Sequence, residues 1–426
     1  MERRFAARKK EMLAECEVSS KVFAGMMTRL HEFAQPFADS LARREQKEHT
    51  QTYLSGLLSD LERKNTESIA YRHDQDRRDL QHFIGVSAWD QQPLLRELAR
   101  QVGEEIGEPD GVIVFDPSGF PKKGKASVGV ARQWLGRLGK VDNGQVAVYM
   151  GYTSRSEHAL VNERLFLPRE WTRDKARCRK CGVPSDIRFQ TRHELAFEML
   201  AEQGKYLPHT WIAGDVEMGR STAFRRGLRA REEQYLLAVP SNTGVRDLAA
   251  PLPAYGGRGA KPKQAFQRVT RWCESRKESD WVRVNVRDGE KGPLVVEILK
   301  TRVQAKTEQK RGAVTEELLV VIRYKKVGEK VLTHDYYISN APADTPVDEL
   351  ARVAKAEHRI EECLKRGKSE AGLADYEVRT WRGWHHHQAL SLIATWFLLL
   401  ESRRGKKIHP GDDGAASTQG SGEVAA

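Results

Sequence analysis

The sequence predicts a mixed α/β protein with a helical N-terminal domain and an antiparallel β insertion. Apolar residues recur at helical spacing through residues 1–104, and apolar strand patterns alternate with helical ones from residue 105 onward. Short alternating strands separated by glycines then fill residues 241–335. A chain of 426 residues has room for two or three such domains.

Charge and cysteine content narrow the classes of function. The chain carries 71 Lys and Arg against 59 Asp and Glu, a net charge of +12, which favours a polyanionic partner such as nucleic acid or a membrane surface. Five cysteines are too few and odd in number for a disulfide framework, so a reducing cytoplasm fits better. The longest apolar run, at 394–400, is far too short to span a bilayer. We therefore expect a soluble cytoplasmic protein that contacts DNA or RNA, with no membrane partner.

The N-terminal helical domain has two open interpretations. Arg72, Arg77 and Arg78 give it a cationic surface that would suit DNA, but no helix-turn-helix signature accompanies them. The domain is thus either a DNA-binding domain or a helical cap that only packs on the next domain.

Individual elements can be placed from residue 105 onward. The predicted strands are 112–116, 145–152, 158–167, 211–214 and 235–239 in a first core segment (105–240), and 281–287, 294–303, 316–324 and 331–338 in the insertion (241–335). The predicted helices are 191–203 and 220–231, then 347–367 and 385–403 in a second core segment (336–403). The tail at 404–426 is rich in Gly, Ser and Ala, and we expect it to be disordered. The insertion is basic on its polar face, which is either a solvated surface or a nucleic-acid contact.

The first candidate site residue is Asp116, which ends the apolar run Val-Ile-Val-Phe of residues 112–115. Such a run suits a strand buried on both faces. The turn-forming stretch 117–125 follows and carries Lys122, Lys123 and Lys125. A carboxylate beside a basic loop suits a metal ion that faces a polyanion. Taken alone, Asp116 could instead be a helix N-cap or a turn residue.

The second candidate, Asp215, repeats the pattern at the end of the apolar run 211–214. Strand C-termini gather at one edge of an α/β sheet, where ligands bind. A third carboxylate, Glu361, lies on a predicted helix, and Lys365 and Lys368 share its face one and two turns away. Three such carboxylates could hold divalent ions, with the lysines on phosphates. A surface Glu–Lys pair is the alternative interpretation of the helix.

Several motifs together resemble bacterial insertion-sequence transposases of the DDE family. They are Asp116 with Ser-Gly-Phe-Pro-Lys-Lys-Gly at 118–124, Gly-Val-Ala-Arg-Gln at 129–133, Gly-Lys-Val-Asp-Asn-Gly-Gln at 139–145, Gly-Asp at 214–215, Arg-Ile-Glu-Glu at 359–362 and Trp-Arg-Gly-Trp-His-His-His at 381–387. The resemblance covers about residues 80–400. It implies a ribonuclease-H-like mixed sheet flanked by helices, with a β-rich insertion before the helix that carries the catalytic Glu.

The resemblance also implies a site and a reaction. Asp116, Asp215 and Glu361 would be both the catalytic triad and the ligands of two Mg²⁺ ions, with Mn²⁺ as a substitute. Lys122, Lys123, Lys125, Arg359, Lys365 and Lys368 would contact DNA. The protein would bind the terminal inverted repeats of its element, cleave the DNA and transfer the strand to a target, as a homodimer on paired ends associated with the bacterial nucleoid. The alternatives are a non-catalytic DNA-binding regulator derived from a transposase and a metal-dependent nuclease that does not join.

One signature of the family is incomplete. Part of the family carries Tyr, Arg, Glu and Lys at fixed spacing, and from Glu361 the Lys position is matched by Lys368. The Arg position is Glu357 and the Tyr position is Ala354. Either Arg352, Arg359 or His358 replaces the phosphate contact, with Tyr336 or Trp381 stacking on an extruded base, or the enzyme makes no tight hairpin intermediate.

Three further features carry weaker predictions. Cys178 and Cys181 have the spacing of half a zinc site, but no second pair lies near them in the sequence. The histidines at 385–387 more readily pack or touch DNA than bind metal, and the Asp-Asn-Gly at 142–144 suggests a turn.

Overall fold

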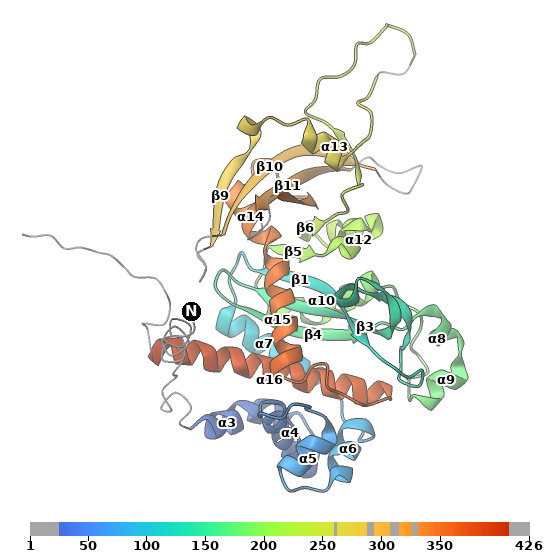
Figure 1. The fold of residues 1–426 in the computed structure, drawn as a ribbon, viewed down its shortest axis with the longest axis vertical. Coiled ribbons are helices and arrows are strands. Elements are labelled where there is room, and N and C mark those ends of the chain that lie inside the picture. Colours follow the sequence, from blue (N-terminus) through green and yellow to red (C-terminus); the bar gives the residue numbers. More distant parts are fainter. Residues whose placement is uncertain (1–24, 260–261, 288–293, 307–314, 326–330, 409–426) are drawn as a thin grey trace, which may run out of the picture.

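A mixed 12-stranded sheet is the centre of the computed structural model, which describes residues 25–259, 262–287, 294–306, 315–325 and 331–408 (Figure 1). Its strands are β1 Val112–Pro121, β2 Ala131–Leu135, β3 Lys140–Thr153, β4 His158–Leu165, β5 Trp211–Gly214, β6 Gln234–Ala238, β7 Gly244–Asp247, β8 Gln267–Arg268, β9 Val282–Arg287, β10 Leu294–Ala305, β11 Glu316–Lys325 and β12 Leu332–Ser339. The helices are α3 Met26–Asp39, α4 Arg44–Leu57, α5 Thr66–Arg72, α6 Arg77–Gly85, α7 Gln92–Ile106, α8 Arg169–Arg173, α9 Lys175–Lys180, α10 Arg192–Gln203, α11 Val216–Arg220, α12 Thr222–Arg229, α13 Val269–Glu274, α14 Val347–Ala354, α15 Ala356–Glu370 and α16 Trp381–Ile408. The predicted α/β class, with a mixed sheet and flanking helices, is confirmed.

Strand β1 lies in the middle of the core part of the sheet. The order there is β4, β3, β1, β5, β6, with β4, β3 and β1 antiparallel and β1, β5 and β6 parallel. The apolar residues at 112–115 are fully buried, as a strand covered on both faces requires. This arrangement places the end of β5 beside the middle of β1, with Gly214 opposite Phe115.

Strand β1 continues beyond the predicted end at Asp116. It runs to Pro121 because its antiparallel neighbour β3 pairs with it as far as Gly144, opposite Pro121. The parallel ladder with β5 stops earlier, at Phe115 opposite Gly214. Asp116 therefore sits in mid-strand, where one ladder ends and the other continues, and the basic loop begins only after Pro121. The Asp-Asn-Gly at 142–144, predicted as a turn, lies within β3 because β2 pairs with it.

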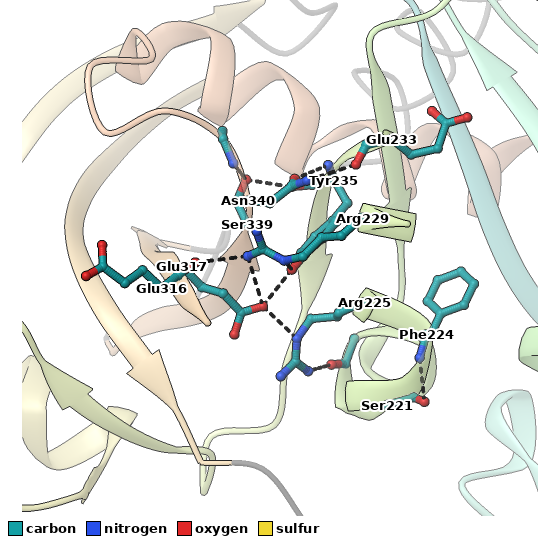
Figure 2. A network of polar contacts seen from close by, with 12 residues as sticks. Ser221, Phe224, Arg225, Arg229, Glu233, Tyr235, Glu316, Glu317, Ser339 and Asn340 are labelled. Atoms are coloured by element: carbon teal, nitrogen blue, oxygen red, sulfur yellow. Dashed lines mark hydrogen bonds and ion pairs between the residues drawn. The ribbon is translucent and has the colours of Figure 1, made fainter. Parts of the chain in front are cut away.

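The β-rich segment after β6 extends the same sheet. Strand β12 pairs antiparallel with β6, and β11, β10, β7 and β9 follow outward. The predicted boundary at 335/336 thus falls inside β12. The junction is also held by a buried network (Figure 2), in which Arg225 of α12 donates to Glu317 of β11 at 2.9 Å and Tyr235 of β6 donates to the same oxygen at 2.6 Å. Removing one partner of a buried pair typically costs about 3–5 kcal/mol, so this network firmly joins the segment to the core.

Helix α16 separates the sheet from the N-terminal helices α3–α6 (Figure 1). It packs on β4 on one side and on α4 and α6 on the other. Its three consecutive histidines are buried, and His386 lies between two backbone carbonyls, 2.9 Å from that of Ile84 and 2.8 Å from that of Trp89. Of the two expectations for these histidines, packing is the one that the structure shows. The helix runs on to Ile408, so residues 404–408 of the predicted disordered tail are helical, and 409–426 lie outside the described residues.

The helix predicted at 347–367 is two helices. The break falls at Lys355, whose ammonium is 2.8 Å from Asp335 Oδ2 and 4.1 Å from the centre of the Tyr324 ring. The break lets α14 pack on β9 and β10 while α15 crosses β1, β3 and β4. Helix α15, which carries the predicted catalytic Glu, is thereby positioned over the core strands (Figure 1).

Candidate active site

Asp116 is a half-buried carboxylate on the central strand. Burial and the negative charges of Asp215 and Glu361 raise its pKa well above the usual range, while the ammonium of Lys368 opposes the rise. The ladder fixes the backbone on both sides of Asp116, so its position varies little. A carboxyl group in this setting favours any cation that enters the site.

Asp215 follows β5 directly and caps helix α11. Its Oδ1 accepts hydrogen bonds from the backbone N–H groups of Glu217 and Met218, both at 3.1 Å. Burial raises its pKa to about 6, although these two hydrogen bonds oppose the rise. The preceding Gly214 is required for packing, because a Cβ there would meet Met218 at 3.0 Å and the carbonyl of Phe115 at 3.1 Å. That close packing, rather than a ligand, accounts for the glycine next to the acid.

Glu361 lies on α15 and is far more exposed than the two aspartates. Its side chain is 58% exposed, and one oxygen lies 3.4 Å from Nδ1 of His358, whose Nε2 lies 3.4 Å from Glu362. Asp116, Asp215 and Glu361 nevertheless line one cavity of about 640 Å³. Its other lining residues are Pro117, Ser118, Gly119, Gly136, Leu364, Lys365, Lys368 and Ser369.

A fourth carboxylate, Glu357, belongs to the same cluster. It is half-buried on α15 one turn before Glu361, and the charges of Asp215, Asp116 and Glu361 add to burial in raising its pKa well above the usual range. Glu357 lines a second cavity of about 620 Å³, and Glu361 lines both cavities. From the sequence, Glu357 was identified only as the residue in place of the family's Arg. Its i, i+4 spacing to Glu361 was the signal that the two carboxylates share one face of the helix.

The predicted DNA-contacting lysines have different surroundings. Lys365 and Lys368 line the acid cavity, and Lys368 Nζ donates to Ser118 Oγ at 2.7 Å. Lys123 and Lys125 are exposed on the basic loop. Lys122 turns inward, where it donates to the carbonyl of Tyr376 at 3.2 Å and lies 3.5 Å from the centre of that ring. Burial lowers the pKa of Lys122 to about 8, so this residue is less suited to a phosphate than its neighbours.

Arg359 lies away from the surface on which a phosphate would bind. Its guanidinium donates to the carbonyls of Ser154 at 2.7 Å and Arg155 at 3.1 Å, and also to that of Ser156. The residue is 9% exposed. The structure therefore places Arg359 as an anchor of α15 on the turn between β3 and β4, unlike the expected DNA contact.

The two cysteines at 178 and 181 are buried free thiols. Cys178 donates to the carbonyl of Trp171 at 3.1 Å and Cys181 to that of Ala126 at 3.4 Å. The Cys178 contact joins α9 to α8, and the Cys181 contact holds the end of α9 against Ala126, which follows the basic loop.

The donor set of the acid cavity fits a hard divalent cation. All the candidate ligands are carboxylate oxygens, which Mg²⁺ and Mn²⁺ prefer. Burial is the largest cause of the raised pKa values of Asp116 and Asp215, and the negative charges of neighbouring carboxylates add to it. Within the described ranges, however, no three His, Cys, Asp or Glu side chains are close enough to hold one ion among them. The exposed Glu361 side chain would have to turn into the cavity, which its helix position permits.

The mixed α/β fold is consistent with a nuclease, and comparison with known proteins identifies the family. The family model for DDE superfamily endonucleases matches residues 36–293, more than half of the chain. The chain therefore belongs to the DDE superfamily endonucleases, and the predicted resemblance and enzyme class are confirmed. Enzymes of this family generally use divalent metal ions. The matched range contains Asp116 and Asp215 but not the carboxylates of α15.

A curated relative points in the same direction. The chain is 43% identical over 97 residues to a protein of Microchaete diplosiphon named "Probable transposase for insertion sequence element IS701". The match covers 22% of this chain and 25% of the relative. Separately, no helix in the described part of the chain is long and apolar enough to cross a membrane.

Proposed function

We propose that this chain is an insertion-sequence transposase that binds the terminal inverted repeats of its element, cleaves them and joins the freed strand to a target. The observation that carries the proposal is the single cavity lined by Asp116, Asp215 and Glu361 together with Lys365 and Lys368. Metal-dependent phosphodiester chemistry needs carboxylates that bind the metal ions and cationic side chains that bind the DNA phosphates. Family membership and the named relative support a transposase function.

We propose further that the core is ribonuclease-H-like. The support is the order β4, β3, β1, β5, β6, with three antiparallel strands followed by two parallel ones. In this assignment the segment from β7 to β11 is the insertion. Strand β12 connects the strands of this insertion to the core sheet. The helical segment before β1 would contribute to end binding, and two copies would act on two paired ends.

The residues of the site divide into two groups by role. Asp116, Asp215 and Glu361 would hold two Mg²⁺ ions, which when bound would activate water and stabilise charge at the phosphorus. The negative charges of both other acids act on Asp116, which supports its place in the same ligand set. Lys365 and Lys368 would hold the phosphates on either side of the reacting one. Lys368 is already oriented by Ser118 and by the ring of Phe120, 4.8 Å away.

The second cavity supports a hairpin intermediate with an extruded base. It is lined by Tyr324, His334, Tyr336, His358 and Glu361, among others, so aromatic rings lie next to the acid cluster. Trp381 does not line it. Of the three replacements considered for the missing Arg, Arg352 pairs with Asp110 at 3.2 Å and Arg359 is buried, so the exposed His358 is the one we propose.

The test is a cleavage and joining assay with purified full-length protein. A duplex carrying one terminal repeat and its flank, incubated with Mg²⁺, should yield nicked ends with free 3′-OH groups, and a hairpin band on a denaturing gel. Pre-cut ends with 3′-OH groups should join to a plasmid. Cleavage without joining would favour the nuclease alternative, and binding without either reaction would favour the regulator.

A further inference from the structure

The hairpin of β2 and β3 presents an apolar patch next to the acid cavity. Trp134 of β2 is 58% exposed and lies directly opposite Val141 of β3, which is 49% exposed. Leu138, in the turn between the strands, is 40% exposed. All nine tryptophans fall within the described ranges, and Trp134 alone among them is exposed. A cluster of large exposed apolar side chains on an edge hairpin is a marker of an interaction site.

The hairpin is fixed relative to the acid cavity. Leu135 is buried against Gly119, where an added Cβ would come within 2.8 Å of its side chain, and both Gly119 and Gly136 line the cavity. Strand β2 alternates buried and exposed residues, so Arg132 and Trp134 share the outer face while Leu135 faces inward. The apolar patch of Trp134, Leu138 and Val141 thus stands at the rim of the cavity on a rigid support.

The charges around this patch are mainly positive, and the acid next to Val141, Asp142, is paired with Lys140 at 3.0 Å. The basic loop is tied to the hairpin, since Asn143 donates to the carbonyl of Gly124 at 2.9 Å and accepts from the N–H of Lys122 at 3.0 Å. Lys123 and Lys125 of this loop are exposed and form no ion pair with a carboxylate among the residues that the structure describes. Arg132 adds a third exposed cation on the outer face. A patch with this charge favours a polyanion that also offers flat apolar faces.

We propose that Trp134, supported by Leu138 and Val141, stacks on a base of the DNA that enters the acid cavity. Nucleic acid combines phosphates for the cations with bases for the ring, and aromatic side chains stack on bases whatever the sequence. Apolar side chains inserted between base steps also unstack and bend a duplex. The hairpin would therefore hold the DNA open beside the reacting phosphate. The proposal rests on the proposed function and adds a positioning residue to it.

Tryptophan emission tests the contact without requiring catalysis. The full-length protein is titrated in EDTA with a duplex carrying the terminal repeat and its flank, labelled so that anisotropy reports binding separately. The contribution of Trp134 is the difference between the wild type and Trp134→Phe. We expect DNA to quench this contribution and to shield it from acrylamide.

The matched pair Trp134→Ala and Trp134→Phe gives the second readout. Loss of one base-stacking contact should weaken DNA binding by roughly 5- to 100-fold in Trp134→Ala, and the phenyl ring should restore most of it. Because Trp134 is exposed, both variants should unfold at the wild-type temperature, which excludes misfolding as the cause.

Three results would overturn the proposal, each in a different way. DNA that binds normally while the Trp134 emission stays unchanged would remove the stacking contact and leave the proposed function intact. Quenching that follows protein concentration without DNA would show that a second copy of the chain covers the patch. No binding of the terminal repeat by the wild type would instead contradict the proposed function itself.

Discussion

The two sides of the acid cavity are built differently. On the sheet side, the backbone of Asp116 is held in the ladder between β1 and β3, and the Asp215 carboxylate is held by two backbone N–H groups, so both residues have fixed places. On the helix side, Glu361 is mostly exposed, and one of its carboxylate oxygens lies 3.4 Å from Nδ1 of His358. A rigid pair of acids facing an adjustable one suits a site that closes around its metal ions when DNA arrives. We therefore expect substitutions on the two sides of the cavity to have different effects on cleavage, DNA binding and stability.

The largest effect should come from the three predicted ligands. Asp116→Asn, Asp215→Asn or Glu361→Gln should reduce cleavage by at least about a thousandfold, because each removes an oxygen ligand that metal-assisted chemistry needs. End binding, measured by anisotropy in EDTA, should stay close to that of the wild type. An equal loss of binding would indicate that these residues are structural.

Substitutions of the three glutamates on α15 can show which of them is the metal ligand. We expect Glu357→Gln to lower cleavage by on the order of tenfold, because its charge acts together with those of Asp116 and Asp215 without Glu357 being one of the proposed ligands. Glu362→Gln should have little effect and serves as the matched control on the neighbouring position. If Glu357→Gln or Glu362→Gln abolishes cleavage while Glu361→Gln does not, the ligand on α15 has been misassigned.

The basic residues should separate into phosphate contacts and a structural anchor. Lys365→Ala should weaken end binding several-fold. It should also reduce the slope of log K against log salt concentration by about one, because one counterion fewer is released on binding. Arg359→Ala should instead lower the stability by about 1–3 kcal/mol, because it leaves buried carbonyls without donors. Urea unfolding together with binding at several salt concentrations distinguishes the two. If Arg359→Ala loses the hairpin product while its stability is unchanged, Arg359 contacts a DNA phosphate and is not only a structural anchor.

The smallest effect concerns pH and the sheet side. The pKa of Asp215 is raised to about 6 in the folded protein, so the folded state binds more protons than the unfolded one between about pH 4 and 6. The contribution of Asp215 to the stability in EDTA should therefore fall as pH rises through this window. Asp215→Asn, which can still cap α11, should be more stable than the wild type by about 1 kcal/mol at pH 7 and no more stable at pH 4. Thermal unfolding of both proteins at the two pH values measures this difference, and an advantage of Asp215→Asn that is larger at pH 4 than at pH 7 would contradict the direction of the shift.

The sheet side was also the more predictable one from sequence. Runs of buried β-branched residues locate β1 and β5 well, and an acid after such a run is conspicuous. The extent of β1 was missed because it depends on β3, a partner distant in sequence. On the helix side the periodicity placed Glu361 but could not reveal the break at Lys355, which depends on contacts with Asp335 and Tyr324. The inward turns of Lys122 and Arg359 likewise depend on carbonyls far along the chain and leave no local sequence signal.

The central claim is that Asp116, Asp215 and Glu361 together hold the divalent ions. The most direct measurement is anomalous diffraction from crystals of the full-length protein bound to a terminal-repeat duplex with Mn²⁺. We predict two Mn²⁺ peaks in the acid cavity, with Asp116 between them and Glu361 turned inward from its exposed position. Manganese bound elsewhere, or held by Asp116 and Asp215 while Glu361 still faces solvent, would contradict the assignment.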